Sequence, residues 1–152
     1  MTIDPRRAVF AGVLLLANRM QATYDAVLQE VTLKQWLALA VVANLPQPVA
    51  STAVVARALG TSHQNVRKLL AALADKGLLD LAASPADARA RQVSLTPAAL
   101  ALFQRQEARG ERRLDDLFAG IPAADVDTCL QVLESMSRSL TGDGLTPPAQ
   151  EA

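Results

Sequence analysis

Side chains that can hydrogen-bond to nucleic acid are concentrated in residues 62–77. The apolar positions of this segment recur at spacings of three and four, which predicts an amphipathic helix; they are Val66, Leu69, Leu70 and Leu73. The opposite face carries polar and basic side chains, namely His63, Gln64, Asn65, Arg67 and Lys68. Such side chains reach base edges and phosphates from a major groove, where arginine suits guanine and asparagine or glutamine suits adenine.

The flanking residues predict where this helix begins and ends. Ser62 suits an N-cap, because its hydroxyl can accept a hydrogen bond from an unpaired amide of the first turn, and we include it among the DNA-binding candidates. Gly77 suits the C-terminus, with Lys76 at the negative end of the helix dipole. A shorter helix, Thr52–Leu59, should precede it and end at Gly60, since glycine readily takes a left-handed backbone.

A basic hairpin is predicted directly after this helix. Leu78–Leu81 and Gln92–Leu95 are short strand candidates, and Pro85 and Asp87 favour a turn between them. Arg89 and Arg91 place positive charge near the tip, which suits the negative potential of a narrow minor groove. We expect Asp87 to orient Arg89 by a paired hydrogen bond. Asp87, Arg89 and Arg91 are therefore the second group of candidate DNA-binding residues.

Residues 32–96 have the order of elements of a winged helix-turn-helix, and they resemble the MarR family of bacterial transcription regulators. The resemblance is sharpest in the run KGLL at 76–79, in the Asp87-x-Arg89 pair and in Leu95-Thr96. It implies that helix 62–76 enters the major groove and that Arg89 lies near the minor groove. One departure is Ala99, where members of the family usually carry glycine; it affects a helix start more than DNA contact.

The rest of the chain is predicted to be helical. The hydrophobic share is 51% but the aromatic share only 3%, so the core is mainly Leu, Val and Ala. We expect helices over 5–29, 33–44, from Pro97 to a break at Ile121-Pro122, with Gly110 a kink or a close-packing point, and over 123–140. Arg6 and Arg7 before the apolar run 8–17 would also fit a secretory signal, but the run is too short to span a membrane and its helical pattern continues to Val31.

The predicted fold class is mainly α with a small β-hairpin wing, formed by one domain. The winged helix-turn-helix occupies 32–96, helices 5–30 and 97–140 serve dimerisation, and 141–152 form a disordered tail. The outer helices carry long apolar stripes that a small lobe cannot cover, and the simplest partner is a second copy. A homodimer would bring two recognition helices to the half-sites of a palindrome. The resemblance to the MarR family implies the same arrangement.

Charge is unevenly distributed, although the formal net charge is zero. Residues 51–96 hold six Lys or Arg against three acids, a net of plus three, whereas residues 97–152 hold five Arg against nine acids, a net of minus four. This separates a basic contact region from an acidic remainder. The interleaved charges of 105–116 are typical of a solvated, salt-bridging helix face.

Several residues have both a functional and an ordinary interpretation. His63, the single histidine, suits a phosphate or base contact but would also suit a plain surface. Cys129, the single cysteine, lies on an apolar helix face, where buried packing is favoured over redox sensing. Tyr24, Trp36 and Phe103 suit core packing and also the small-molecule pocket that the family resemblance implies.

The sequence predicts a cytoplasmic, homodimeric, DNA-binding regulator, specifically a repressor that a small aromatic molecule releases from a palindromic operator. The residues form no catalytic triad, phosphate loop or metal-ligand cluster, so we expect no enzyme activity, no cofactor and no membrane partner. The alternative is a helical dimer that kept the winged-helix scaffold but acts through protein contacts. The operator, the target genes, the effector and the choice between repression and activation are not encoded in these patterns.

Overall fold

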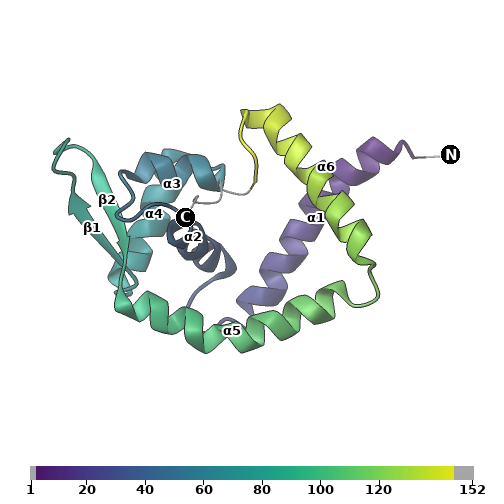
Figure 1. Ribbon diagram of the computed structural model, residues 1–152, viewed down its shortest axis with the longest axis horizontal. Helices are drawn as coiled ribbons and strands as arrows, with labels where there is room; N and C mark the ends of the chain where they lie inside the picture. The colour runs from purple at the N-terminus through teal and green to yellow at the C-terminus, as the bar shows by residue number, and fades with distance from the viewer. Residues whose placement is uncertain (1–2, 146–152) are drawn as a thin grey trace.

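The computed structural model describes residues 3–145, which form six helices and one two-stranded antiparallel sheet. One lobe, at the left of Figure 1, contains α2 (Leu33–Ala43), α3 (Thr52–Leu59), α4 (His63–Asp75), β1 (Leu79–Ala83) and β2 (Arg91–Leu95). At the right, α1 (Pro5–Asp25) and α6 (Ala123–Thr141) cross in the view, and α5 (Pro97–Phe118) runs along the lower edge between the two sides. The predicted fold class, mainly α with a β-hairpin wing, is confirmed.

The lobe has a tightly closed core of aliphatic side chains. Leu39 of α2, Val55 of α3 and Leu70 of α4 are fully buried, and Val93 of β2 joins them. Burying a side chain of this size contributes about 1.5–3 kcal/mol to stability. Because one face of each short helix and of the hairpin is buried in the same core, the lobe holds its outer faces in a fixed relationship.

Side-chain caps set the starts of the lobe helices. Thr32 and Gln35 form a capping box at α2, and Ser51 and Thr96 accept amide hydrogen bonds at the starts of α3 and α5. Gly60 ends α3 in the left-handed conformation with φ of 63°, as its sequence position predicts. Ala99 is completely buried and donates its amide to Thr96, so the departure from glycine leaves the start of α5 intact.

The end of α1 differs from the prediction of a helix to Gln29. The helix ends at Asp25, because the Asp25 carboxylate accepts a 2.6 Å hydrogen bond from the amide of Leu33. This bond joins the end of α1 to the start of α2 and requires the chain to turn between them. The apolar spacing of Val27 and Val31 continues past the helix, and Val31 is buried in the lobe core instead.

The hairpin is longer than predicted at its tip and starts one residue later. Leu79 pairs with Leu95 and Ala83 pairs with Arg91. Leu78 lies outside the strand, because its amide donates to the Leu73 carbonyl and closes the end of α4. Val49 adds a single antiparallel bridge to Val93, with hydrogen bonds of 2.8 and 3.0 Å in the two directions, and so ties the hairpin to the α2–α3 connection.

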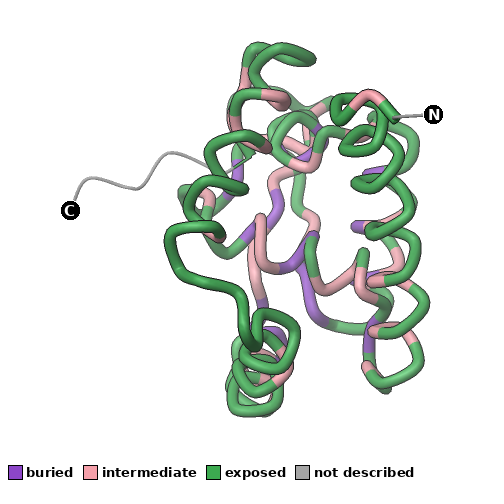
Figure 2. The backbone as a smooth tube through the Cα atoms, turned by 90° about the vertical axis from the view of Figure 1, so that its right-hand side faces the viewer, coloured by how far each residue is buried: buried purple, intermediate pink, exposed green. Residues whose placement is uncertain are grey.

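The flanking helices bury little within one chain. Neither α1 nor α6 contains a buried residue, and the burial colours of Figure 2 show how much of the trace is exposed. Phe10 on α1 is 65% exposed and Leu130 on α6 is 49% exposed. Cys129 is also exposed, so its predicted burial is wrong within the single chain, because none of the described elements covers that face of α6. None of the helices within residues 3–145 combines the length and the hydropathy that a membrane crossing requires.

The C-terminal segment differs from the predicted disordered tail over its first residues. Helix α6 continues to Thr141, and Gly142 caps it in the left-handed conformation with φ of 82°. Asp143 then pairs with Arg57 of α3, so residues 142–145 are positioned against the lobe. A local sequence pattern cannot reveal such a distant partner. Residues 146–152, the remainder of that predicted tail, lie outside the described residues.

Candidate nucleic-acid interface

The outer face of α4 presents the polar residues in the arrangement that the sequence predicts. Val66, Leu70 and Leu73 are completely buried on the inner face. The opposite face is exposed and carries His63, Gln64, Asn65, Arg67 and Lys68. The hydroxyl of Ser62 accepts a 3.2 Å hydrogen bond from the amide of Asn65, so it caps the helix and retains one proton to donate.

The side chains of this outer face are available to a ligand. Within the described residues, none of the side chains of His63, Gln64, Asn65, Arg67 and Lys68 takes part in a hydrogen bond or an ion pair. Each backbone position is nevertheless fixed, because the buried leucines hold the helix in the lobe core. A rigid helix with unengaged donors and acceptors suits the reading of base edges, which requires fixed geometry.

The wing turn corrects one detail of the predicted geometry. Asp87 was expected to bind the guanidinium of Arg89, but its Oδ1 accepts a 2.9 Å hydrogen bond from the Arg89 backbone amide. The turn is closed further by the amide of Ala90, which donates to the Asp87 carbonyl at 2.9 Å. Asp87 therefore shapes the backbone of the turn, as aspartate commonly does two residues ahead of an amide. The guanidinium of Arg89 is left exposed at the turn.

Arg91 lies farther from the tip than Arg89. It is the first residue of β2 and pairs with Ala83, and its Nη1 donates a long 3.4 Å hydrogen bond to the Leu81 carbonyl. The side chain thus lies along the hairpin, although it remains exposed. Of the two wing arginines, Arg89 is the better placed to extend beyond the hairpin.

Two basic residues of the predicted contact region are engaged inside the protein. The guanidinium of Arg57 forms two hydrogen bonds to Asp143, at 2.7 and 2.9 Å. The ammonium of Lys76 donates to the Glu30 carbonyl at 2.7 Å and to Oε1 of Gln35 at 3.0 Å. Sequence charge counts cannot distinguish such engaged cations from free ones. Among the basic residues of 51–96, Arg67, Lys68 and Arg89 therefore have side chains that no other described residue engages, and Arg91 makes only the long bond to the Leu81 carbonyl.

A cavity of about 670 Å³ lies beside the lobe, between α1, α2 and α5. It brings together the three aromatic residues that the sequence singled out, Tyr24, Trp36 and Phe103. Trp36 and Phe103 also pack against the lobe core, and their rings meet edge to face with centroids 6.4 Å apart. Trp36 and Phe103 therefore pack against the core and also line the cavity, which is the position that a ligand-binding role would require.

The remaining lining of this cavity was not predicted. Its wall is mostly apolar, and charged or amide groups occur on α5, among them Gln104, Glu107, Glu111 and Arg113. Gly110 lies in the same wall, and a Cβ added there would meet no atom within 4 Å. Gly110 is thus not a close-packing point in this chain. Helix α5 runs unbroken through this position, and the absent side chain leaves space in the cavity.

A second hollow of about 730 Å³ lies between α1 and α6. Apolar side chains dominate its α1 wall, where Phe10, Val13 and Leu14 lie, and α6 contributes Val132, Met136 and Leu140. This hollow places the two exposed helix stripes next to each other. Across residues 3–145, no group of three or more His, Cys, Asp or Glu side chains is arranged to hold a metal ion.

Comparison with known proteins finds a family whose sequence profile matches the lobe and several solved structures of similar fold. Residues 29–90 match the sequence profile of the MarR family. A structure of BpsR from Bordetella bronchiseptica, described in connection with regulation of its DNA binding by 6-hydroxynicotinic acid, is 26% identical and superposes with a TM-score of 0.70 over 83% of this chain and 91% of that chain.

Two further structures share the fold. PcaV from Streptomyces coelicolor, a transcriptional regulator in complex with its natural ligand, is 18% identical with a TM-score of 0.77 over 92% of this chain and 99% of its own. MepR from S. aureus, in complex with DNA, is 19% identical with a TM-score of 0.71 over 84% of this chain and 93% of its own. The similarity in each case extends over the flanking helices as well as the lobe.

Proposed function

We propose that this chain is a ligand-responsive repressor of the MarR family that binds a palindromic operator as a homodimer. The observation that carries the proposal is the outer face of α4, where Gln64, Asn65 and Arg67 stand exposed and unengaged on a helix held by a buried core. These side chains would contact base edges in the major groove, and Lys68 would contact phosphate. MepR, which shares the fold, forms a complex with DNA.

The wing would supply the second contact. The Arg89 guanidinium extends from a turn that Asp87 holds in shape, and it would enter the minor groove beside the recognition helix. His63 begins α4, at the end of the helix nearest the turn from α3, where a phosphate or base contact would be made. Arg91 would add positive charge along the hairpin and favour the approach of DNA.

A second copy of the chain would cover the exposed stripes of α1 and α6. Phe10 and Leu14 are more than half exposed and lie together with Val13 in one apolar stripe, and a contiguous exposed stripe of this kind is typical of an interface. Pairing of these helices would place two α4 helices at half-sites about 34 Å apart, one turn of DNA. This spacing is the quantity that an effector would change.

The cavity beside the lobe would hold the effector. It adjoins Trp36 on α2 and Phe103 on α5, so a bound ring would contact the lobe and the long helix together. Filling the cavity would shift the lobe relative to α5 and alter the half-site spacing. BpsR and PcaV are described with small-molecule ligands, which supports an aromatic effector for this chain. For this shift to release DNA, the effector must bind the shifted position of the lobe more tightly than the position that binds DNA.

The experiment that tests DNA binding is a fluorescence-anisotropy titration against the DNA upstream of the protein's own coding sequence. A scrambled duplex of equal length serves as the control, and each titration is run at low and at physiological salt. A regulator binds the native duplex more tightly than the scrambled one and weakens as salt rises, because phosphate contacts release counterions.

Equal and weak binding to both duplexes, together with a stable dimer in solution, would instead favour the protein-contact alternative. In that case the apolar faces of the dimer, rather than α4, would be the surface to examine, and salt would have little influence on the association.

A further inference from the structure

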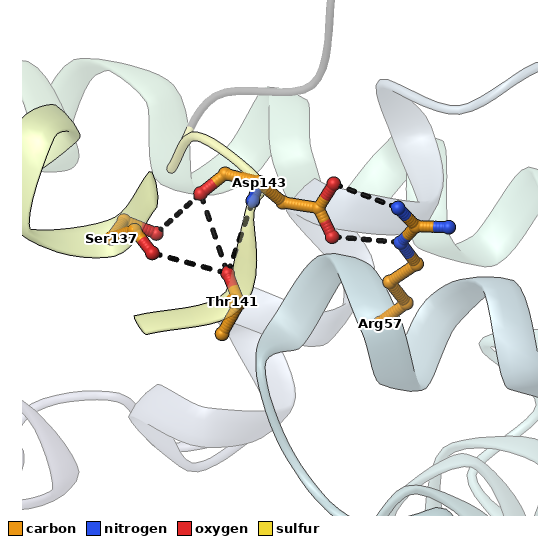
Figure 3. Close-up of polar contacts among 4 residues, drawn as sticks. All are labelled: Arg57, Ser137, Thr141 and Asp143. Atoms are coloured by element: carbon orange, nitrogen blue, oxygen red, sulfur yellow. Dashed lines mark hydrogen bonds and ion pairs between the residues drawn. The ribbon is translucent and has the colours of Figure 1, made fainter. Parts of the chain in front are cut away.

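The C-terminal end of α6 makes an ordered contact with the DNA-binding lobe. Nε and Nη2 of Arg57 donate to the two carboxylate oxygens of Asp143 at 2.7 and 2.9 Å, which makes the pair bidentate (Figure 3). The two residues are 86 positions apart in the chain. This contact therefore joins α3 of the lobe to the segment that follows α6.

Asp143 is held in place by its own helix end. The hydroxyl of Ser137 donates to the Asp143 carbonyl at 2.8 Å, and the Asp143 amide donates to Oγ1 of Thr141 at 3.2 Å (Figure 3). Gly142 reverses the chain with a positive φ, and a Cβ on Gly144 would collide with the carboxylate of Glu134. The segment is thus folded back on α6, and the carboxylate of Asp143 points toward the lobe in one direction.

The contact lies where it can restrict movement of the lobe relative to the flanking helices. The lobe connects covalently to the flanking helices through the α1–α2 segment and through α5, and Glu30 and Arg105 join these two connections by a 2.9 Å ion pair. In Figure 1 both connections lie at the lower edge of the lobe, whereas the C-terminal segment reaches it from the upper edge. Two neighbouring attachments allow a lobe to pivot, and a third attachment away from them opposes the pivot.

We propose that Asp143 is a positioning residue for operator binding, because its pair with Arg57 holds the lobe against the end of α6 and so fixes the orientation of α4. The inference rests on the proposed function, since the orientation matters only when two lobes must match two half-sites. A lobe that is already oriented loses less conformational freedom on binding the operator, and affinity rises accordingly. Non-specific binding, which needs no matched spacing, gains little.

The direction in which Asp143→Asn changes the affinity for DNA distinguishes a positioning role from a purely electrostatic one. Asp143 is acidic, so replacing it with asparagine makes the protein more positive and should tighten binding to any DNA. Loss of the Arg57–Asp143 pair, which we call the tether, has the opposite consequence: binding to the operator becomes weaker, and binding to other DNA does not. A variant of equal charge change distinguishes the two: Asp127 is an exposed acid on α6 for which the described residues provide no ion pair.

The test compares Asp143→Asn, Asp127→Asn and the reciprocal double variant Arg57→Asp with Asp143→Arg in the full chain, after thermal melts show that each is folded. Anisotropy titrations use the upstream duplex and its scrambled control. We expect Asp143→Asn to lose about fivefold in operator affinity, which is near the upper end of what one exposed ion pair contributes. The scrambled duplex should show no loss, Asp127→Asn should bind both duplexes at least as well as the parent, and the double variant should recover operator affinity to within about twofold.

Operator binding by Asp143→Asn that equals or exceeds the parent would overturn the proposal, as would an equal loss on both duplexes. Amide hydrogen exchange of the free protein tests the tether without DNA. Faster exchange in residues 51–60 and 137–145 of Asp143→Asn, reversed in the double variant, supports the tether, and unchanged exchange overturns it. If the unmodified protein binds both duplexes equally, the proposed function is overturned instead. The hydrogen-exchange result still shows whether the tether forms.

Discussion

The backbone amide of Arg89 donates a 2.9 Å hydrogen bond to Oδ1 of Asp87, so the carboxylate shapes the wing turn while the guanidinium stays exposed. Because Asp87 acts on the backbone and Arg89 presents its side chain, substitutions of the two residues should have separable effects on DNA binding. Arg89→Ala removes the contact that we propose in the minor groove, whereas a change at Asp87 acts through the shape of the backbone.

Replacing Asp87 with alanine should weaken operator binding by roughly 1 kcal/mol, because the turn loses one hydrogen bond and Arg89 loses its fixed position. Asp87→Asn keeps an oxygen acceptor and should retain most of the affinity. The measurement is the same duplex titration. If Asp87→Ala binds the operator like the parent while Arg89→Ala binds it more weakly, the turn holds its shape without the carboxylate.

Arg67 and Lys68 should differ in the kind of binding they support. Arg67→Ala should cost about 1–3 kcal/mol on the operator and relax the preference for one base pair, if its guanidinium contacts a base with two hydrogen bonds. Lys68→Ala should weaken all duplexes alike and lower the salt dependence by about one phosphate contact. Titrations over several salt concentrations against operator and scrambled duplex check both expectations. Equal effects of the two variants on both duplexes would contradict the assignment of base reading to Arg67.

Leu14→Glu should convert the dimer that we propose into a monomer. Leu14 is 56% exposed on α1 and lines the hollow between α1 and α6, so a glutamate there would bury a charge in the proposed interface. Val54→Glu is the matched control, since Val54 is a 39% exposed residue of α3 in the lobe. Sedimentation equilibrium measures the outcome, and a dimer that persists in Leu14→Glu would place the interface elsewhere.

Trp36 provides an intrinsic probe of the cavity, because it is the single tryptophan of the chain and lies in the cavity wall. A set of benzoates, benzylamines and phenols should contain compounds that quench its fluorescence in a saturable manner. Gly110→Leu should reduce this quenching, since its side chain would occupy space that the glycine leaves open.

Gly110→Ala serves as the control for the backbone effect of that substitution. It should raise the free energy of unfolding by roughly 0.5–1 kcal/mol, because alanine loses less conformational freedom than glycine in a helix interior. Urea denaturation measures this change. Quenching that Gly110→Leu leaves unchanged, in a protein of at least parental stability, would argue against ligand binding beside Gly110.

The pair with Arg57 also lowers the pKa of Asp143. The main cause is the hydrogen bonding from the guanidinium, burial opposes it by raising the pKa, and the positive charge of Arg57 adds a smaller lowering effect. The pKa is lowered in the folded protein, so the contribution of the pair to stability is present at neutral pH. It is lost only as pH falls below the ordinary value of 3.8 through the lowered pKa. Carboxyl NMR titration should show the Asp143 pKa below 3.8 in the parent and closer to it in Arg57→Gln. Equal values in the two proteins would mean that the pair does not persist in solution.

Short-range patterns determined much of the fold. The bounds of α3 followed from Thr52 to the left-handed Gly60, and the buried face of α4 followed from the spacing of Val66, Leu70 and Leu73. Both features depend on residues within one or two helical turns, so the sequence contains all the information that they need. The outer polar face of α4 follows from the same periodicity.

Contacts between distant residues were decided only by the tertiary structure. The charge balance of the sequence placed Arg57 and Lys76 in a basic contact region, yet Asp143 and the Glu30 carbonyl engage them across 86 and 46 positions. The exposure of Cys129 and the end of α1 at Asp25 likewise depend on which elements cover or join them. Periodicity shows which face of a helix is apolar, but burial and ion pairing depend on what the folded chain brings against that face.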